Sequence, residues 1–556
     1  MTSEAADGAN GSVLVVGAGP VGLTMACELL RRGVKTRIVD ACPVPADNSR
    51  ALAVQARTLE ALDAMGIADR FVAAGRKIHG VNFYADGSRL AHVSLDDVDS
   101  PYTYILALPQ SETERLLAEH LAELGGRVER EVKLTTLEQD AGGVTATLAH
   151  AGGKVESERV AWLVGCDGSH SAVRHALGLQ FDGLPYEESF VLADVRIAWE
   201  LPDDEAHAFI APDGAIAAFP LPRGLWRLVG EAAIPTPTVD DLARLLRERG
   251  GPKATVTSAG WVAPFRIHRR IVPRYREGRV FVAGDAAHIH SPVGGQGMNT
   301  GMQDAYNLAW KLALAVSGAA RDTLLDSYDP ERRPVAAATL QGTDLATKVV
   351  TLRNPVAREV RNRLGAMLAG LEIVQKRLLA QASEIAVGYR SSPIVDEHRA
   401  SVARATVGKR VGEQPTLADW VGFGGAPHPG DRAPDVALDD AVTAFSLLRH
   451  TGSTLLLFDG AAPTPEGYAN LADIARRVGE RWGAHVKTWI VVPRRARPTE
   501  LGGEEPVLLD PKAALHRRYG AGSECLYLLR PDGYVGFRSQ PASWQALEEH
   551  LTRILV

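Results

Sequence analysis

The feature that most constrains the fold is a glycine-rich turn between an apolar run and a helical pattern near the start of the chain. The run Ser12–Val16 has the valine-rich character of a parallel strand covered on both faces. The turn Gly17-Ala18-Gly19-Pro20-Val21-Gly22 follows at once, and residues 23–30 continue with helical spacing. A strand, a GxGxxG turn and a helix in this order predict a Rossmann-like α/β domain that binds a dinucleotide.

Each glycine of this turn has its own expected role. Gly17 permits the tight turn, Gly19 lets the backbone approach a pyrophosphate, and Gly22 lets the helix pack on the strand. The pyrophosphate is expected at the free amides and positive end of the helix. A second strand over residues 35–39 ends in Asp40, whose carboxylate suits the ribose hydroxyls of FAD or NAD and would repel a 2′-phosphate. This motif alone leaves both FAD and NAD open.

Two later segments repeat the order of a buried strand and a polar turn. Residues 161–164 lead into Asp167-Gly168, and residues 279–283 lead into the segment that contains Asp285 and His288. A glycine-rich loop then precedes a long helix from Met298 to about residue 317. Asp285 stands where open α/β sheets place ligand contacts. His288 and His290 resemble metal ligands, but no acid or cysteine stands at ligand spacing, so we expect no metal site.

The middle of the chain has a different pattern. Residues 183–275 alternate more regularly and contain Pro/Gly turns and aromatic residues, which predicts a mostly antiparallel sheet inserted into the nucleotide-binding domain. We expect this sheet to form the floor of a mostly apolar substrate pocket, with Arg223 and Arg227 solvated beside a turn. A Gly/Pro-rich stretch over residues 422–431 predicts a linker, and a separate, smaller α/β unit follows it.

Composition excludes several classes of protein. The chain of 556 residues can bury several cores, and its net charge of −6 argues against a nucleic-acid binder that depends on phosphate contacts. The four cysteines form no CxxC pair, which fits a reducing cytoplasm. The start of the chain lacks the basic flank of a signal peptide. Residues 8–27 carry no charge, but glycines interrupt them, so we expect no membrane span.

Three blocks occur in the order GAGPVG, GCDGSHSAVR and GDAAHIHSPVGGQGMNTGMQDAYNLAWKL. Together with NSRALAVQARTLE, LPQSETERLL and LLDSYDPERRPV, they resemble the FAD-dependent aromatic hydroxylases, the class A flavoprotein monooxygenases. The tail, with PGDRAPD and AGSECLYLLRPDGYVGFR, resembles the thioredoxin-like domain of phenol hydroxylases and polyketide-tailoring hydroxylases. The resemblance implies an α/β FAD-binding domain over 1–182 and 276–424, a substrate-binding sheet over 183–275 and a thioredoxin-like domain over 425–556.

The resemblance also implies the cofactors and the chemistry. FAD would be reduced by NADPH or NADH as a visiting reductant, would capture O₂ as a C4a-hydroperoxide, and would transfer a hydroxyl group to a phenolic or polycyclic polyketide-type ring. The implied contacts to FAD are Gly17, Gly19, Pro20 and Gly22 at the pyrophosphate, Asp40 at the adenosine ribose, Arg50 and Gln110 at the diphosphate–ribityl region, Asp167 and Gly168, Asp285 at a ribityl hydroxyl, and Pro292, Gly297, Met298 and Asn299 at the isoalloxazine ring. No side chain is named as a catalytic base.

Several alternatives stay open. A related FAD oxygenase of the epoxidase or Baeyer–Villiger type shares these motifs, whereas a halogenase is disfavoured because the WxWxIP pattern is absent. A non-catalytic flavoprotein-derived binder of aromatic ligands is a further possibility, and a dehydrogenase without flavin would leave the second glycine-rich block unexplained. We expect a neutral polycyclic substrate, a monomer or homodimer, and a structural or interfacial tail, because a tail without CxxC cannot do dithiol chemistry.

Overall fold

The computed structural model describes residues 11–45, 51–85, 87–212, 214–249, 254–289, 295–350, 375, 379–401, 414–438, 443–461, 463–503 and 505–556. These residues form two compact units. The first unit contains residues 1–62, 67–309 and 332–385, and the second contains residues 63–66, 310–331 and 386–556. The four-part division expected from the sequence remains a prediction.

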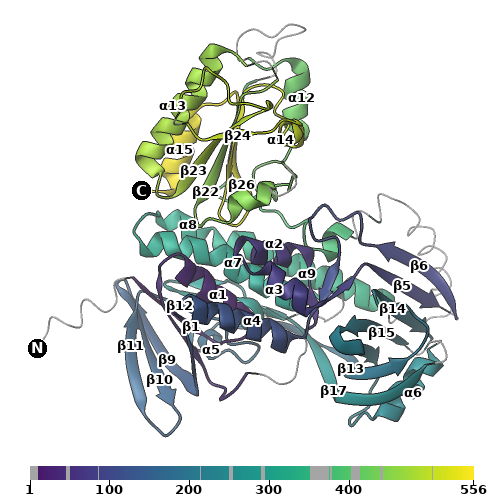
Figure 1. The fold of residues 1–556 in the computed structure, drawn as a ribbon. Coiled ribbons are helices and arrows are strands. Elements are labelled where there is room, and N and C mark those ends of the chain that lie inside the picture. The colour runs from purple at the N-terminus through teal and green to yellow at the C-terminus, as the bar shows by residue number, and fades with distance from the viewer. Residues whose placement is uncertain are drawn as a thin grey trace, which may run out of the picture. The chain divides into compact units, whose positions relative to one another are not determined.

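The first unit is built on a six-stranded sheet in the order β18-β19-β12-β1-β2-β8. Figure 1 labels two of its strands, β1 and β12. Strands β1 (Ser12–Val16), β2 (Lys35–Asp40), β12 (Trp162–Gly165), β19 (Val280–Val282) and β8 (Val128–Arg130) run parallel, and β18 (Arg276–Glu277) closes one edge antiparallel. β1 is wholly buried. Its apolar run therefore forms the centre of the sheet, as the sequence predicts.

Helices follow the strands of this sheet. α1 (Pro20–Arg31) begins directly after the glycine-rich turn and packs against α4 (Gln110–Glu123). α7 (Gly297–Val316) begins after the second glycine-rich block, within one residue of the predicted start. A three-stranded antiparallel sheet of β9 (Val132–Asp140), β10 (Gly143–His150) and β11 (Val155–Val160) stands beside the parallel sheet (Figure 1).

An eight-stranded sheet completes the first unit, in the order β20-β17-β13-β16-β15-β14-β5-β6. Six strands come from the central part of the chain: β13 (Asp182–Ala198), β14 (Glu205–Ala211), β15 (Gly214–Leu221), β16 (Leu225–Glu231), β17 (Thr255–Ile271) and β20 (His288–Ile289). The other two, β5 (Gly80–Ala85) and β6 (Ser88–Ser94), join through a parallel pairing of β5 with β14. The mostly antiparallel sheet is thus confirmed, with three strands, β5, β6 and β20, from outside residues 183–275.

One face of this sheet forms an apolar core. Phe209, Trp226 and Leu228 are buried there with Leu242 and Leu246 of helix α6 (Val239–Glu248). α6 starts at a capping box, in which the Thr238 side chain and Asp241 satisfy each other's backbone groups. A further three-stranded sheet consists of β3 (Ala53–Val54), β7 (Ile105–Ala107) and β4 (Arg76–Ile78). Its strands β4 and β7 contact β15 of the eight-stranded sheet, on the face away from α6.

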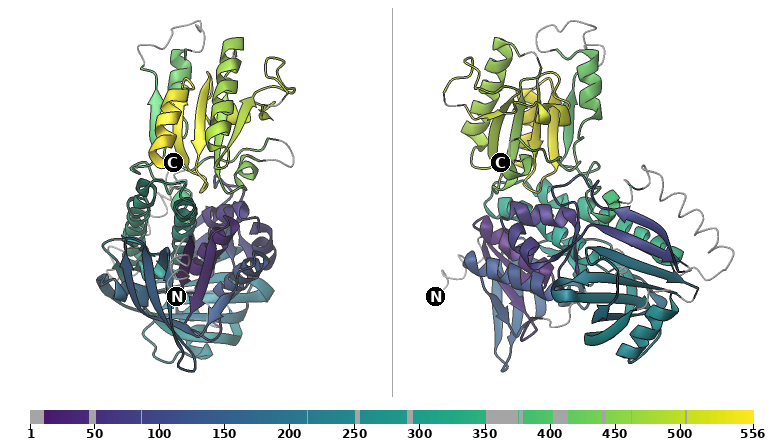
Figure 2. Two further views of the ribbon diagram at one scale, coloured as in Figure 1. Left: turned by 90° about the vertical axis from the view of Figure 1, so that its left-hand side faces the viewer. Right: turned by 45° about the vertical axis from the view of Figure 1, so that its right-hand side comes forward.

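The second unit contains a six-stranded sheet in the order β21-β26-β25-β22-β23-β24. Its strands are β21 (Asp396–Arg399), β22 (Ser453–Phe458), β23 (Val486–Val492), β24 (Val507–Leu509), β25 (Cys525–Leu529) and β26 (Val535–Gln540). Helices α13 (Pro465–Trp482) and α15 (Trp544–Ile554) cover one face, and α12 (Leu417–Gly425) and α14 (Ala514–Arg518) lie on the other (Figure 2). This is the thioredoxin-like domain that the sequence predicts.

Residues from well before the tail belong to the same unit. Trp310 of α7 and Leu324 of α8 (Asp322–Asp326) are buried in one core with Leu547 and Leu551 of α15. The backbone N–H of Arg321 donates to the carbonyl of Ile554. The C-terminal sheet therefore shares its core with the last turns of α7 and with α8.

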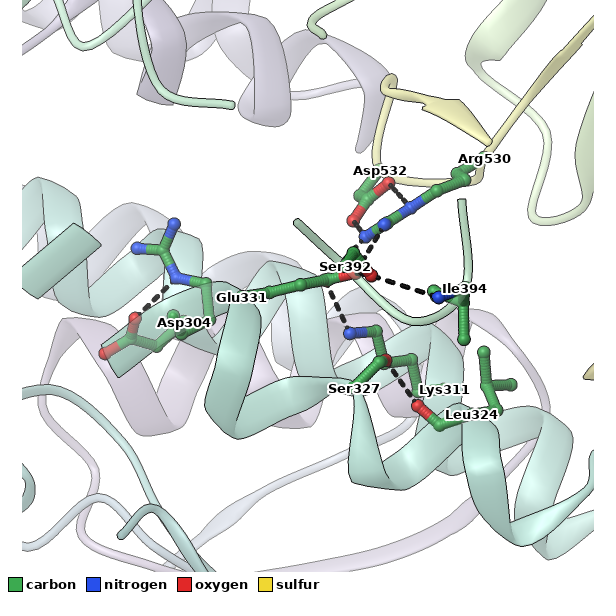
Figure 3. A network of polar contacts seen from close by, with 10 residues as sticks. Asp304, Lys311, Leu324, Ser327, Glu331, Ser392, Ile394, Arg530 and Asp532 are labelled. Carbon is green, nitrogen blue, oxygen red and sulfur yellow. Dashed lines mark hydrogen bonds and ion pairs between the residues drawn. The ribbon is translucent and has the colours of Figure 1, made fainter. Parts of the chain in front are cut away.

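A buried charge network lies beside this core (Figure 3). Glu331 of α9 (Tyr328–Val350) accepts two hydrogen bonds from Arg530, at 2.6 and 2.9 Å, and one from Lys311 at 2.7 Å. Ser392 donates a further bond to Glu331, and Asp532 accepts two from Arg530. Two carboxylates thus balance two cations, which removes the cost of an unpaired buried charge.

The predicted linker differs from the structure at its start. Residues 422–425 form the last turn of α12 instead of an extended connection, and Phe423 is buried in the core of the second unit. A capping box of Thr416 and Asp419 starts this helix, and the apolar contact of Phe423 outweighs the low helix propensity of the glycines around it. Within the described ranges, no helix is both long enough and apolar enough to cross a membrane.

Candidate functional site

The glycine-rich turn has the geometry of a phosphate cradle. Gly17 has φ +102°, and a Cβ built on it would lie 2.4 Å from the Cys166 carbonyl oxygen. A Cβ on Gly22 would lie 1.9 Å from the Gly17 carbonyl oxygen, so both positions exclude any larger residue. A Cβ on Gly19 meets no atom of the described chain within 4 Å. Gly19 thus borders open space at the N-terminus of α1, where Pro20 is the first helical residue, and a pyrophosphate fits there.

Asp40 organises the same turn. Its Oδ2 accepts a hydrogen bond from the Ala18 N–H at 2.6 Å, and its Oδ1 accepts one from the Cys42 N–H at 2.8 Å. Arg130 lies 3.6 Å from Oδ1. The carboxylate therefore holds β2 against the glycine-rich turn, and each oxygen keeps a lone pair that a ribose hydroxyl could use. The ribose contact itself remains a prediction.

Asp167 and Gly168 form the turn after β12. The carboxylate of Asp167 accepts hydrogen bonds from the Ser171 hydroxyl at 2.5 Å and from the Val173 N–H at 3.2 Å. Burial raises the pKa of the Asp167 carboxyl above its usual value, against the effect of these bonds. Gly168 has φ +75°, which favours glycine. Asp167 therefore helps to cap the short helix α5 (Ala172–Ala176), and nothing in this geometry assigns it a ligand.

Asp285 lies in a short turn after β19 and is exposed, although its neighbours Gly284 and Ala286 are buried. Asp285 therefore lies at the surface, directly after a buried strand end. His288 lies in the same segment but is fully buried, with its Nε2 2.7 Å from Asp304. Among the residues that the structure describes, no group of three or more His, Cys, Asp or Glu could hold a metal ion.

Asp304 of α7 connects three parts of the first unit. Its Oδ2 accepts a hydrogen bond from the Gly284 N–H and lies 2.7 Å from Nε2 of His288. Its Oδ1 accepts a hydrogen bond from Arg332 at 2.7 Å. Arg332 also donates to the Thr300 carbonyl. Burial alone would raise the pKa of Asp304, but the charges of Arg332 and His288 lower it below its usual value. The carboxylate thus fixes α7 to the turn that carries Asp285.

Asn299 fixes the start of α7 to strand β3. Its side-chain oxygen accepts a hydrogen bond from the Gln55 N–H at 2.9 Å, and its amide donates to the carbonyls of Ala53 and Gly295, both at 2.8 Å. The side chain is fully buried. Its hydrogen bonds are therefore used within the protein, and the expected approach to a flavin ring rests on the half-buried backbone of Gly297 and Met298.

A buried carboxyl, Glu384, lies against the first turns of α7. It accepts hydrogen bonds from Thr300 at 3.2 Å and from the side chain of Gln303. Burial raises the pKa of Glu384 to about 8, although the Arg332 charge and the two hydrogen bonds act in the opposite direction. Near neutral pH this carboxyl is therefore largely protonated, which lets it remain buried without a cation in direct contact.

Gln110 begins α4 and lies beside the loop that follows Arg50. Its backbone N–H donates to the Ala51 carbonyl at 3.1 Å, and its side-chain oxygen lies 3.4 Å from the Ala51 N–H. The start of α4 is therefore joined to Ala51 by two hydrogen bonds. Arg50 and Pro292 lie outside the described residues, as does His290.

Strand register arranges side chains in rows on the face of the eight-stranded sheet opposite α6. Residues directly opposite each other on adjacent strands lie on the same face. One row contains Trp261, Asp194, Arg227 and Phe219, and the next contains Ala263, Leu192, Val229 and Ala217. We call these eight residues the two-row face. Its second row is small and apolar, which suits the side of a flat ring system.

The expectation that Arg227 is solvated was wrong. Its side chain is 0% exposed, and it pairs with both oxygens of Asp194 at 2.6 and 2.7 Å. The local Pro-Arg-Gly turn suggested exposure, but Arg227 lies on β16 directly opposite Asp194, between two other strands. Arg223, at the tip of the same turn with φ +64°, is exposed as expected.

Sequence reasoning named none of Asp304, Arg332, Glu384 and Asp194 as functional. The contacts of Asp304, Glu384 and Asp194 join segments 16 to 84 residues apart, so no local spacing shows them. One signal was available for Asp304. A single acid within the apolar helical stretch of residues 302–316 is costly to bury and implies a buried partner.

Comparison with known proteins gives two family matches. Residues 10–343 match the family model described as FAD binding domain, and residues 426–556 match the model described as aromatic-ring hydroxylase, C-terminal. The first match covers both glycine-rich blocks and the eight-stranded sheet. The second covers the C-terminal sheet.

Similar proteins cover nearly the whole chain. The 6-methylpretetramide 4-monooxygenase of Streptomyces rimosus is 38% identical over 97% of this chain and 92% of its own length. The pentachlorophenol 4-monooxygenase of Sphingobium chlorophenolicum is 33% identical over 96% and 94%. The solved structure of an anhydrotetracycline hydroxylase from Streptomyces rimosus matches with a TM-score of 0.74 at 31% identity, over 98% of this chain and 99% of that one. An aklavinone-11 hydroxylase, solved with FAD and aklavinone, matches with a TM-score of 0.72 at 26% identity, over 98% and 99%.

Proposed function

Because the chain belongs to the FAD-dependent aromatic-ring hydroxylases, we propose that it hydroxylates a phenolic or polycyclic aromatic substrate with NADPH or NADH as the reductant. The chain is a flavoprotein monooxygenase, and FAD is its cofactor. When bound, FAD supplies the redox chemistry: it takes electrons from the nicotinamide and activates O₂ for transfer of one oxygen atom to the ring. The protein itself binds FAD and the substrate, orients them, and shields them from water.

The observation that carries the proposal is the combination of two sites in one compact unit. The open space at Gly19 lies at a helix N-terminus, and the two-row face offers small apolar side chains in the adjoining sheet. The N–H groups and the dipole of α1 would hold the pyrophosphate. The apolar row would bind an aromatic ring through buried area, at about 25 cal/mol per Å² before ordering costs.

We assign the remaining cofactor contacts as proposals. Asp40 would bind the adenosine ribose, Gln110 and Arg50 the diphosphate–ribityl region, and Asp285 a ribityl hydroxyl, with Asp167 and Gly168 nearby. Pro292, Gly297, Met298 and the backbone of Asn299 would lie along the isoalloxazine ring. The N-terminus of α7 would stabilise negative charge there, because its first N–H groups have no helical partner.

The charge balance of the two-row face favours a neutral substrate. A carboxylated phenol needs a cation to pair with its charge when water is excluded. Arg227 already pairs with both oxygens of Asp194, so its charge is balanced before any substrate arrives. A neutral polycyclic phenol or quinone therefore suits this face better than a small benzoate.

The test uses the full-length protein. Its visible spectrum should show bound flavin after purification or after reconstitution with FAD. Oxidation of NADPH or NADH should be faster in the presence of an aromatic ligand, and the product should carry one oxygen atom from isotope-labelled O₂. Product NMR separates ring hydroxylation from epoxidation or ester formation. A protein that cannot be loaded with FAD, or whose NAD(P)H oxidation no phenol or quinone stimulates, would contradict the proposal.

A further inference from the structure

The two-row face contains a buried ion pair between residues that are otherwise apolar. Asp194 of β13 and Arg227 of β16 are direct cross-strand partners near the centre of the sheet. The guanidinium donates from Nε and Nη2 to the two carboxylate oxygens, at 2.6 and 2.7 Å. Replacing a buried pair by apolar residues of similar volume is often neutral or stabilising. Stability alone therefore does not explain why this pair lies here.

The two partners are unequally exposed. The Arg227 side chain is 0% exposed, whereas the Asp194 side chain is 20% exposed. Of the two charged groups, only the Asp194 carboxylate is therefore accessible to a ligand on this face, because the Arg227 guanidinium is buried. A carboxylate oxygen has two lone-pair directions, and Arg227 uses one on each oxygen. Asp194 can therefore still accept a hydrogen bond, and it has no hydrogen to donate when ionised.

The surroundings indicate which donor fits. Trp261 lies opposite Asp194 on β17, and Phe219 lies opposite Arg227 on β15, so an aromatic residue stands on each side of the ion pair in this row. The adjacent row is made of Leu192, Val229 and two alanines. A flat ring placed along the small residues would bring a substituent on its edge to the carboxylate. The substituent must carry an O–H or N–H group.

We propose that Asp194 accepts a hydrogen bond from a hydroxyl group of the aromatic substrate, and that Arg227 is the positioning residue that holds the carboxylate in place. The proton stays on the substrate oxygen, so no group is transferred. The inference rests on the proposed function and deepens it, because it limits the substrate to rings with a free hydroxyl at one edge.

A second contact of Arg227 gives this pair a link to the cofactor region. Its Nη1 donates to the Ala51 carbonyl at 3.3 Å, and the same carbonyl accepts the backbone N–H of Gln110. Gln110, which is proposed to contact FAD, and Arg227, which positions the proposed substrate contact Asp194, thus donate to the same carbonyl oxygen. Arg227 therefore connects the proposed substrate contact to the segment that precedes β3.

The test compares two ligands that differ in one hydroxyl group, 2-hydroxyanthraquinone and anthraquinone. Their dissociation constants are measured on the FAD-loaded full-length protein from changes in the flavin spectrum and in tryptophan fluorescence. The wild type should bind the hydroxylated probe at least about tenfold more tightly, as expected for a hydrogen bond to a charged acceptor. Asp194→Asn should reduce this ratio several-fold, and the double variant Asp194→Leu/Arg227→Met should bring it close to one while binding of anthraquinone persists.

Controls separate positioning from folding. The double variant leaves no unpaired charge, so it should retain flavin and melt close to the wild type. Glu205→Gln changes another partly buried carboxylate of the same sheet, paired with Asn82 and His92, and should keep the wild-type ratio. The inference is overturned if the wild type shows no preference or binds neither probe, or if the double variant keeps the preference. Discrimination that depends on Asp194 without any stimulated NAD(P)H oxidation would contradict the proposed function and leave this inference standing.

Discussion

Two glycines of the same turn differ in what surrounds them, and this difference can be tested. A Cβ at Gly22 would collide with the Gly17 carbonyl oxygen, whereas a Cβ at Gly19 would enter open space. We expect Gly22→Ala to destabilise the protein by about 1–3 kcal/mol through overpacking, with or without FAD. Gly19→Ala should leave the stability of the flavin-free protein unchanged and weaken FAD binding.

Thermal melting of the flavin-free and FAD-loaded forms, with a titration of FAD, distinguishes these effects. The two alanine variants serve as controls for each other, because they add the same methyl group three residues apart. Equal loss of stability in both flavin-free variants would mean that Gly19 is a packing glycine, and would count against the proposed pyrophosphate site.

Glu384 should make the stability of the first unit depend on pH. Its pKa is about 8 in the folded protein, against an ordinary value of 4.5. Between these values the folded state binds the proton and the unfolded state does not, so stability falls as pH rises, by about 1.4 kcal/mol per unit for one full proton. Asp304 opposes ionisation of Glu384, and Arg332 favours it.

The variant Glu384→Gln keeps the shape and cannot ionise. We expect its free energy of unfolding to exceed that of the wild type at pH 8, and the two values to lie closer together near pH 5. Chemical unfolding followed by far-UV circular dichroism measures both. If the stability difference between the two proteins does not change between pH 5 and pH 8, the carboxyl does not take up its proton on folding.

At the scale of elements, α7 depends on one buried carboxylate that joins it to two other segments. Asp304 is fully buried and is neutralised by Arg332 of α9. We expect Arg332→Met to cost about 3–5 kcal/mol, because it leaves a buried charge without its cation. Arg115→Met on the exposed face of α4 removes two surface ion pairs and should cost less than about 1 kcal/mol.

Melting temperature and flavin content together test this expectation. Because α7 begins at the proposed isoalloxazine contacts, Arg332→Met should also release FAD more readily than Arg115→Met does. A stable Arg332→Met protein with wild-type flavin content would mean that His288 and the Gly284 N–H suffice to hold Asp304.

The sequence predicts elements better than it predicts the contacts between them. The strands at residues 12–16 and 35–39 and the start of α7 were predicted within a residue, because each has a local pattern with a clear boundary. The Rossmann-like class, the inserted sheet and the thioredoxin-like domain were predicted as well. The burial of Arg227 was not, since it depends on strand register, which pairs residues 33 positions apart.

At the scale of the whole molecule, the second unit includes residues 310–331, which precede the tail by almost a hundred positions. Trp310 and Leu324 are buried with residues of α15, and Glu331 is paired with Arg530. We therefore expect a chain that ends at residue 424 to expose apolar surface, to aggregate, and to retain less flavin, because the last turns of α7 lose their packing.

Size-exclusion chromatography and the ratio of flavin to protein absorbance measure this outcome. Cys525→Ser is the matched control, because it removes the thiol of the tail and keeps the fold. Burial raises the pKa of this thiol well above its usual value, so thiolate chemistry is not expected and the variant should turn over normally. A monomeric, flavin-loaded truncated protein would show that α7 does not need the tail.

The strand order of the parallel sheet has a consequence for synthesis on the ribosome. β1 is made first, but two of the strands beyond it, β12 and β19, come 150 to 270 residues later, and α7 follows them. At about 5–20 residues per second, the chain needs roughly 15–60 s to reach residue 299. One edge of β1 stays unpaired until β12 has been made, and the proposed FAD site stays incomplete until the start of α7 has been made. We therefore expect flavin to bind late in synthesis, and the open edge of β1 to stay exposed until β12 has followed it.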